Sequence, residues 1–341
     1  MKNIYYLFLG MVVAICCVSC NNEWEDEQYL HMASFKANVN AQGVTTTYVR
    51  YKPGGVVQYK LPIIISGSTV SDRPLNIQIA LDPDTLAVLN QNVYGHRQEL
   101  YFQQLPSQYY NMSETVEIPA GETTGVLPID FKLTEDLDQA DKWVLPLQIV
   151  DDPSLGYKAN PRKYFRRAML RLLPFNDYSG TYDAAQYLIH FKTDVDNKEP
   201  FTVSEQRAFV VDDRTVFIYA GTRDIDYLDR KLYKIFIRFP EEGNDTKQLE
   251  VWAENDELNF GPLTDADGKP LAFQSNFSMY SEMDEPKPYL KKIFITMNLY
   301  YEFDDYTTVP GKRIRYKVQG SLSMQRNLNT LIPDEDQQVQ W

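Results

Sequence analysis

The stretch LNIQIAL at residues 75–81 decides the fold class most clearly. Every second residue in it is apolar, which is the pattern of a β-strand with one buried face. Similar runs of β-forming residues occur at 56–65, 126–131 and 143–150. The sequence therefore predicts that the first half of the chain is built from β-strands.

One short helix is predicted directly after this strand, at residues 82–90. Asp82 is a suitable N-cap, and Pro83 fits the first helical position because the amide hydrogen that it lacks would have no partner there. We expect two helical turns at most.

Prolines interrupt three of the predicted strands, at Pro62, Pro128 and Pro146. Because proline cannot donate to a strand ladder, these strands are expected at sheet edges or at bulges. A short β-sandwich accommodates such strands best.

The strand pattern lengthens beyond residue 173, where a proline and two turn formers follow the run at 168–172. The later runs lie at 179–182, 187–191, 208–211, 216–220, 232–239, 249–253, 273–279, 291–303 and 313–324. In the last run Gly320 leaves a gap in a row of apolar residues. Roughly nine strands without a long helix favour a meandering barrel or a sandwich. We predict an all-β chain with one domain at 35–173 and a second at 174–341.

The N-terminus predicts a lipoprotein signal. Lys2 precedes an apolar run at 4–18 that is too short to span a bilayer, and small Ser19 stands before Cys20. We expect the signal at 1–19 to be removed and Cys20 to carry the acyl groups, followed by a tether at 20–34. An ordinary secretory signal or a short membrane anchor is the alternative, but neither explains the position of Cys20.

An acidic run at residues 23–27 follows this cysteine. In lipoproteins of the Bacteroidota such a run looks like the export signal to the outer face of the cell, although a solvated acidic tether fits the same residues. We therefore expect a lipid-anchored protein of the outer membrane that faces the cell exterior.

Charge and cysteine content exclude several classes of protein. The chain has 34 Lys and Arg against 47 Asp and Glu, a formal net charge of -13, which makes nucleic acid an unsuitable partner. Its three cysteines, Cys16, Cys17 and Cys20, all lie in or directly after the signal. The mature fold is thus expected to have no disulfide, thiolate nucleophile or thiolate metal site.

No motif for metal or nucleophilic chemistry stands out. His31, His96 and His190 are far apart in sequence, and no serine lies in a nucleophile elbow. The run at 265–268 resembles the start of a calcium loop, but the later ligands are missing, so a hairpin turn is expected. The acidic run at 134–138 is interpreted as a polar connection between strands. Paired carboxylates in some other β-fold hydrolase stay open.

Several segments resemble a known family. The runs LYFQQLPSQYY at 100–110, IPAG at 118–121 and WVLPLQI at 143–149 look like an N-terminal domain of unknown function in Bacteroidota surface lipoproteins. The second half resembles a companion domain, also of unknown function, through GSLSMQRN at 320–327 and IPDED at 332–336. Together these similarities cover nearly the whole mature chain.

This resemblance implies an Ig-like sandwich followed by an antiparallel β-barrel-like domain, for which a lipocalin-like barrel is one form. It also implies a gene among polysaccharide-utilisation genes beside outer-membrane glycan transporters, and a role in holding glycan at the cell surface. The same N-terminal domain precedes chitinase-like endoglycosidases. Their catalytic strand has closely spaced aspartates ending in a glutamate, on an eight-fold β/α barrel, and this chain has neither feature. We therefore expect no enzyme and no cofactor.

Glycan binding requires exposed aromatic rings flanked by polar side chains, since a sugar ring presents one apolar face and a rim of hydroxyls. The candidates for this role are Trp252, Tyr280, Tyr300, Tyr301 and Tyr306. Because neighbouring residues of a strand point to opposite faces, one of Tyr300 and Tyr301 must point outward. For Trp252 a half-buried position in the barrel wall is the alternative.

Two other classes of function stay open beside the glycan binder. A structural subunit of an outer-membrane glycan transporter predicts no aromatic cluster that is both exposed and concave. A glycoside hydrolase predicts two carboxylates that face each other across a cleft.

Overall fold

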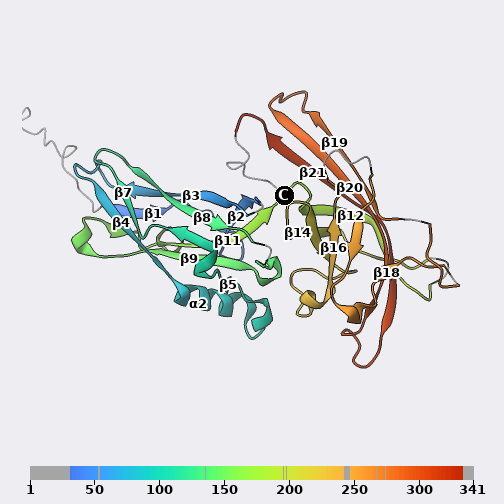
Figure 1. Ribbon diagram of the computed structural model, residues 1–341. Coiled ribbons are helices and arrows are strands. Elements are labelled where there is room, and N and C mark those ends of the chain that lie inside the picture. The colour runs from blue at the N-terminus through green and yellow to red at the C-terminus, as the bar shows by residue number, and fades with distance from the viewer. Residues whose placement is uncertain are drawn as a thin grey trace, which may run out of the picture.

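The computed structural model describes residues 31–52, 54–134, 136–194, 196, 198–241, 246–265, 267–272 and 274–332. Cys20 and residues 21–30 of the predicted tether lie outside these residues. The end of that tether, predicted at residue 34, was wrong, because strand β1 begins at Met32 and Ala33 is fully buried. The protein is mostly β, with 49% strand and 12% helix, and its sheets are curled (Figure 1). Among the described residues no helix has the length and apolar character to cross a membrane. The predicted all-β fold is confirmed.

The first half forms two sheets that pack face to face. One sheet has the order β10-β1-β3-β8-β6, and the other has the order β2-β11-β9-β4-β7 with β5 beside β9. Their bounds are β1 (Met32–Phe35), β2 (Thr45–Arg50), β3 (Val56–Ser66), β4 (Leu75–Leu81), β5 (Gln103–Gln104), β6 (Tyr110–Met112), β7 (Thr115–Ile118), β8 (Thr124–Lys132), β9 (Trp143–Ile149), β10 (Lys158–Ala159) and β11 (Arg167–Phe175). Ile63 and Leu127 from the first sheet and Leu147 and Leu170 from the second are fully buried in one shared core. This is a β-sandwich.

The helix after β4 begins as predicted but is longer. Helix α2 (Pro83–Tyr94) has 12 residues, and the N-cap side chain of Asp82 accepts a hydrogen bond from the Thr85 amide. The expected limit of two turns was wrong. Leu86, Leu89 and Tyr94 carry the helix further because they bury themselves against the outer side of the second sheet.

The prolines lie in interior strands rather than edge strands, contrary to the prediction. Strands β3, β8 and β9 each have neighbours on both sides. Pro146, for example, lies in the gap on one side of β9 between the pairing with β5, which ends at Val144, and the pairing with β4, which begins at Leu147. Pro128 likewise lies one residue outside the part of β8 that pairs with β6. A proline is tolerated there because no partner awaits its missing amide hydrogen.

The second half forms one strongly curled sheet of ten strands, ordered β17-β16-β15-β14-β12-β21-β20-β18, with β13 beside β12 and β19 beside β20. The bounds are β12 (Gly180–Phe191), β13 (Phe201–Thr202), β14 (Glu205–Val210), β15 (Thr215–Tyr219), β16 (Lys234–Arg238), β17 (Glu250–Trp252), β18 (Gly261–Pro262), β19 (Asn276–Met283), β20 (Leu290–Asp305) and β21 (Ile314–Asn329). The bridge between Gln248 and Asn276 brings the start of β19 beside the segment before β17. The sheet is therefore nearly closed into a barrel (Figure 1).

Gly320 has a clear structural reason. Strand β12 contains a β-bulge between Asp183 and Gln186 where it pairs with β21. Gly320 lies there with φ +137°, and a Cβ atom at this position would stand 1.8 Å from the carbonyl oxygen of Gln186. Only glycine allows the two strands to approach so closely.

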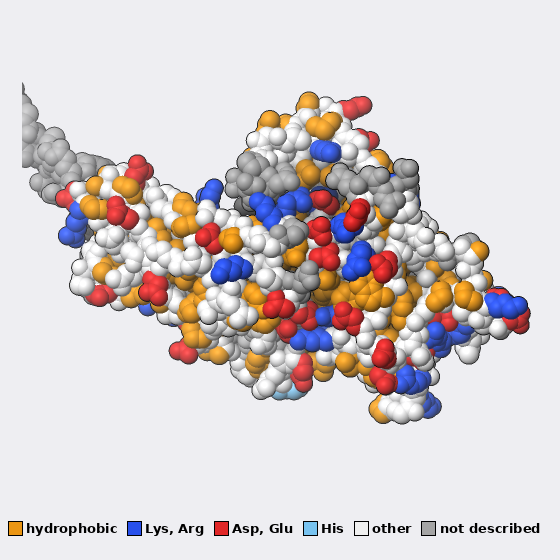
Figure 2. Space-filling view, viewed as in Figure 1, with side chains coloured by type: hydrophobic (Ala, Val, Ile, Leu, Met, Phe, Trp, Pro, Cys, Tyr) orange, Lys and Arg blue, Asp and Glu red, His pale blue; other side chains and the backbone are white. Residues whose placement is uncertain are grey.

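The predicted domain limit between residues 173 and 174 falls inside β11. Its last two residues, Pro174 and Phe175, still pair with β2. The sandwich and the curled sheet are then joined by many side-chain contacts, and Figure 2 shows side chains of both charges along the line where they meet.

Arg230 is the central contact at this junction. It is 2% exposed, and its guanidinium donates to the carbonyl oxygens of Ala140 and Glu99, both at 2.9 Å, from across the junction. Ion pairs between Lys142 and Asp226 and between Lys234 and Asp138 surround it. Nη1 of Arg230 also donates to the carbonyl oxygen of Tyr227, at 3.2 Å. Because a buried cation needs such partners, the contacts that cross the junction hold the two halves in register.

Candidate functional site

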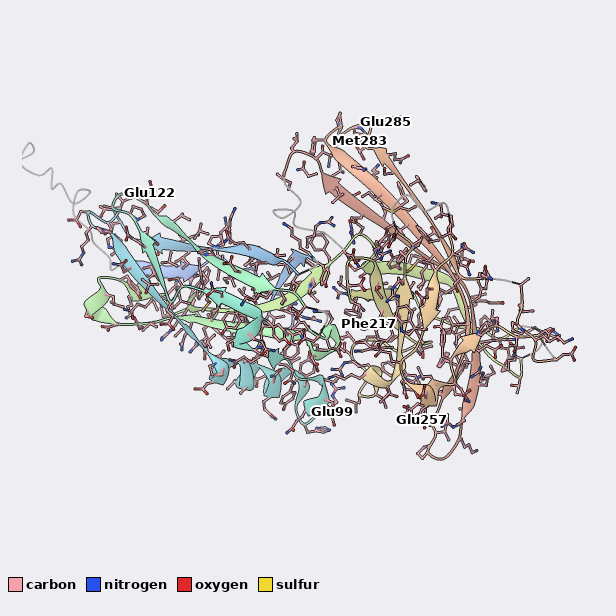
Figure 3. All side chains as sticks on the ribbon, viewed as in Figure 1. Glu99, Glu122, Phe217, Glu257, Met283 and Glu285 are labelled. Carbon is pink, nitrogen blue, oxygen red and sulfur yellow. The ribbon has the colours of Figure 1, made fainter. Side chains whose placement is uncertain are left out.

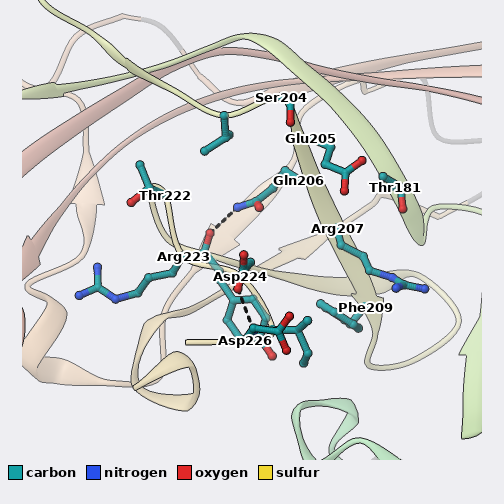
Figure 4. Close-up of a pocket in the computed structure, with 13 residues that line it drawn as sticks. Thr181, Ser204, Glu205, Gln206, Arg207, Phe209, Thr222, Arg223, Asp224 and Asp226 are labelled. Atoms are coloured by element: carbon teal, nitrogen blue, oxygen red, sulfur yellow. Dashed lines mark hydrogen bonds between the residues drawn. The ribbon is translucent and has the colours of Figure 1, made fainter. Parts of the chain in front are cut away.

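A cavity of about 470 Å³ lies where β14 begins and β15 ends, beside the junction (Figure 4). Its lining is mostly polar and comes from two separate loops as well as the strands. The lining residues are Thr181, Val203, Ser204, Glu205, Gln206, Arg207, Phe209, Tyr219, Thr222, Arg223, Asp224, Ile225 and Asp226. We call this space the junction cavity.

Strand β14 supplies its polar wall by alternation. Glu205, Arg207 and Phe209 point to the outer side of the curled sheet, whereas Ala208 between them packs into the barrel core. Gln206 is buried, and its amide nitrogen donates to the carbonyl oxygen of Tyr219 at 2.5 Å. This bond, drawn in Figure 4, fixes the side chain at the base of the cavity.

The loop at 221–226 forms the opposite wall. The amide of Asp226 donates to Oδ1 of Asp224 at 2.7 Å, which shapes the loop into a tight turn. Oδ1 of Asp226 accepts a hydrogen bond from Nζ of Lys142, at 2.8 Å, so the sandwich holds this wall in place. Burial lowers the pKa of Lys142, and the carboxylate of Asp226 opposes that effect.

Arg223 belongs to the cavity wall by its backbone, but its guanidinium is directed elsewhere. It pairs with Asp229 and Asp305, each at 3.1 Å, and lies 3.4 Å from the ring centre of Tyr233. Burial opposes the charge, yet the hydrogen bond to Asp229 and the nearby carboxylates raise the pKa of Arg223. In Figure 4 its side chain points away from the other lining residues.

Arg207 is therefore the cation that faces the cavity. Its guanidinium lies 5.6 Å from the ring centre of Phe209. Tyr48 on β2 approaches it from the sandwich: burial raises the pKa of Tyr48, and the charge of Arg207 offsets only part of this rise. Both halves of the protein thus position this side chain.

The chemistry of the lining suits an uncharged ligand with many hydroxyl groups. Carboxylates, amides, hydroxyls and one guanidinium can donate to and accept from such groups, while Phe209 and Ile225 offer apolar contact. Three lining carboxylates, those of Glu205, Asp224 and Asp226, make the cavity unfavourable for an anion.

The predicted residue Trp252 lies on the outer side of the curled sheet and does not line the cavity. It ends a row of four rings that face one another across neighbouring strands, formed by Phe209, Phe217, Phe236 and Trp252. Its ring stacks on Phe236 with a centroid distance of 5.4 Å, and the guanidinium of Arg238 lies 4.9 Å from its centre. Trp252 is half-buried and packs outside the barrel, on the wall that faces the sandwich.

Tyr301 lies in the barrel core and is 1% exposed. Its hydroxyl is hydrogen-bonded to that of Tyr187, and burial raises its pKa to about 12. It offers no face to a ligand, so its selection as a binding candidate was wrong. Tyr300, its neighbour on β20, points outward, as one of the two had to, and lines a second cavity of about 380 Å³.

Tyr280 on β19 is 60% exposed, and its ring stacks on Phe294 at a centroid distance of 4.8 Å. Tyr306 is half-buried: it stacks on Tyr233, and its hydroxyl accepts from the amide of Asn255 at 2.9 Å. The structure thus brings Tyr280 and Tyr300 to one sheet face and leaves Tyr306 and Trp252 apart from them. Their role in glycan binding stays a prediction.

Across the described part of the chain, no group of three or more His, Cys, Asp or Glu side chains is placed to hold a metal ion. His190 is fully buried, and its Nδ1 lies 3.1 Å from a carboxylate oxygen of Asp194. The segment around Asp265 forms a turn, closed by the bridge between Thr264 and Pro270.

Sequence reasoning missed the junction cavity because its walls come from 203–209 and 219–226, which only the pairing of β14 with β15 brings together. A weak signal was present in Glu205, Arg207 and Phe209, whose spacing of two residues predicts one outward face.

Comparison with known proteins gives two family matches. A domain of unknown function, DUF4973, matches residues 24–153, and a C-terminal domain model matches residues 166–323. A Bacteroides ovatus protein of unknown function has a solved structure that is 37% identical, with a TM-score of 0.77, over 91% of this chain and 100% of its own. This chain belongs to the same family.

Two further members have a similar fold. A Bacteroides ovatus multidomain protein that includes DUF1735 is 37% identical over 92% of this chain and 100% of its own, with a TM-score of 0.76. A Bacteroides thetaiotaomicron protein described as an auxiliary nutrient binding protein is 35% identical over 90% of this chain and 100% of its own, with a TM-score of 0.76. No curated protein matches the sequence.

Proposed function

We propose that this family member is a cell-surface lipoprotein that binds glycan without cleaving it, for a polysaccharide-uptake system. The observation that carries the proposal is the junction cavity, in which several kinds of hydrogen-bonding group lie beside apolar side chains such as Ile225. A sugar needs both, because it presents hydroxyls around its rim and C–H groups on its face.

The size and the charges of the cavity favour a sugar over other nutrients. About 470 Å³ is room for one or two sugar rings rather than a long chain. The lining carboxylates repel phosphates and other acids, and the low share of apolar residues is unsuitable for lipids. A chain end or branch of a neutral glycan fits these conditions best.

Two further facts support the wider proposal. Cys20 follows a short apolar run and precedes an acidic tether, which is the pattern of an exported lipoprotein. A family member that is 35% identical is described as an auxiliary nutrient binding protein. We place the chain at the outer membrane, lipid-anchored and facing the exterior, beside a glycan transporter.

We propose binding rather than hydrolysis because each carboxylate of the cavity either makes hydrogen bonds that stabilise the fold or is exposed to solvent. Asp224 and Asp226 hold the 221–226 loop in shape, and Asp226 pairs with Lys142. Glu205 is exposed to solvent. A glycosidase instead needs a protonated acid and a second carboxylate on opposite sides of the scissile bond.

Affinity electrophoresis of the mature chain against a panel of neutral host and dietary polysaccharides tests the proposal. The double variant Glu205→Ala and Thr222→Ala removes two exposed lining groups that form no described side-chain hydrogen bond. We expect one glycan to retard the wild type, and the variant to bind it about tenfold more weakly.

The double variant Glu122→Ala and Thr124→Ala is the matched control. Both residues are exposed, and Figure 3 shows Glu122 at the end of the sandwich far from the curled sheet. It should bind as the wild type does. If no glycan retards the wild type, a structural subunit of the transporter becomes the better account; release of reducing ends would indicate a hydrolase instead.

A further inference from the structure

The outer face of the curled sheet at β19, β20 and β21 carries a continuous field of uncharged polar side chains. Register pairs place Asn276 beside Asn298 and Ser278 beside Thr296, and β21 continues both rows. The field consists of Asn276, Ser278, Tyr280, Phe294, Thr296, Asn298, Tyr300, Gln319, Ser321, Ser323 and Gln325. We call it the polar face.

Strand alternation shows that these side chains share one side. The intervening residues of β20, Ile295, Met297 and Leu299, are at most 1% exposed and lie in the barrel core. The polar residues of the face are exposed or half-buried. A solvent-facing sheet of a chain with a net charge of -13 would ordinarily carry many charges, so their absence here needs a reason.

Charged side chains lie only at the borders of the polar face. Glu282 pairs in register with Lys292 at one end, and Glu302 with Lys317 at the other. Asp183 lies beside it on the next strand. The field between these borders favours a ligand without net charge.

The hydrogen bonds within the field leave groups for a ligand. The amide of Asn298 donates to Asn276 at 2.8 Å, and the hydroxyls of Thr296 and Ser323 lie 3.3 Å apart. Each amide and hydroxyl has more donors and acceptors than these bonds use. Rows of such groups can bond the hydroxyls of successive sugars.

Aromatic rings stand at both ends of the field. Tyr280, 60% exposed, is supported from beneath by its stacking on Phe294. Tyr300 lies six residues further along β20, which is ~20 Å at the rise of a strand. It lines a cavity of about 380 Å³ with Gln248, Gln274 and Lys247.

We propose that the polar face is a second glycan site, which binds an extended, uncharged oligosaccharide from Tyr280 to the cavity at Tyr300. This deepens the proposed function and rests on it: the junction cavity takes a chain end or branch, and the polar face takes a linear stretch. Two sites on one protein raise the affinity for long polymer through effective concentration.

Isothermal titration calorimetry with neutral oligosaccharides of increasing length, from the glycan that retards the wild type, tests this inference. Affinity should rise with length until the ligand spans Tyr280 and Tyr300. For these ligands Tyr280→Ala and Tyr300→Ala should each raise Kd about tenfold. Tyr164→Ala is the matched control, since Tyr164 is 47% exposed on the sandwich, and should leave Kd unchanged.

The outcomes separate the two proposals. If the wild type binds and Glu205→Ala with Thr222→Ala weakens it, while Tyr280→Ala and Tyr300→Ala leave Kd for every length unchanged, the function stands and the second site is overturned. Preference for a uronic-acid or sulfated oligosaccharide at the polar face would also overturn it. A wild type that binds no glycan removes both proposals.

Discussion

The two walls of the curled sheet have opposite outer surfaces. The wall of β14 to β17 carries a row of four aromatic rings from Phe209 to Trp252, covered by the sandwich and by cations such as Lys234. In Figure 3 Phe217, the second ring of this row, lies between the two halves. The wall of β19 to β21 carries uncharged polar residues and a single exposed ring stack at Tyr280.

This difference separates assembly from binding. An aromatic row is stabilising when another surface covers it, and here the covering surface is part of the same chain. A polar, uncharged face gains little from burial against protein and is suited to a hydrated ligand. We therefore assign the aromatic row of the first wall to joining the two halves, apart from the junction cavity at the edge of that wall, and the open face of the second wall to glycan.

The largest effect is expected where β12 and β21 meet between the two walls. Gly320→Ala places a Cβ atom 1.8 Å from the Gln186 carbonyl oxygen, so one strand must move. The free energy of unfolding should fall by on the order of 5 kcal/mol. Urea denaturation measures it; an unfolding midpoint equal to that of the wild type would show that the bulge is dispensable.

A variant of the junction should act almost as strongly. Arg230→Met removes the donors that satisfy the carbonyls of Ala140 and Glu99 in a buried place. We expect a loss of about 3 kcal/mol and unfolding in two separate transitions. A single transition at the wild-type midpoint would mean that the aromatic row alone joins the halves.

The strand pattern was predictable from sequence, but the different roles of the two walls were not. LNIQIAL at 75–81 became β4 with the same bounds, because alternation reports a local property of the chain. Whether an outward residue is covered depends on what packs there. Trp252 points outward, yet it lies beside Arg238 and Phe236 in the row that the sandwich covers.

The candidate sites could likewise be predicted only in part, because sequence does not show which outward side chains another part of the chain covers. Sequence placed one of Tyr300 and Tyr301 outside but could not tell which, because that depends on which face of β20 the barrel buries. Tyr280 falls just beyond the strand predicted at 273–279, whereas in the structure it lies inside strand β19. Glu205 and Asp224 belong to one cavity only through the pairing of β14 with β15.

The dependence of stability on pH tests the contribution of the buried carboxylate of Asp305. Burial would raise the pKa of Asp305, but hydrogen bonds from Thr308 and the charge of Arg223 lower it from 3.8 to about 2. A carboxylate whose pKa is lowered in the folded state stabilises that state above pH 3.8. This contribution to the free energy of unfolding, about 2 kcal/mol, is lost as the pH falls toward 2. Asp305→Asn should remove that part of the acid sensitivity, seen in unfolding curves between pH 5 and pH 2.

The smallest effect is expected on the polar face itself. Tyr280→Ala removes a ring that is 60% exposed, so the free energy of unfolding should change by less than about 0.5 kcal/mol. Trp252→Ala should cost about 1 to 2 kcal/mol, since it ends the covered row. Equal losses for the two variants in thermal unfolding would contradict the distinction between the walls.

A crystal structure of the mature protein with the neutral oligosaccharide that retards it most tests the central claim most directly. The account predicts sugar density in the junction cavity, within hydrogen-bond distance of Glu205 or Arg207, and along the polar face between Tyr280 and Tyr300. Density confined to other surfaces, or both sites empty at saturating ligand, would contradict it.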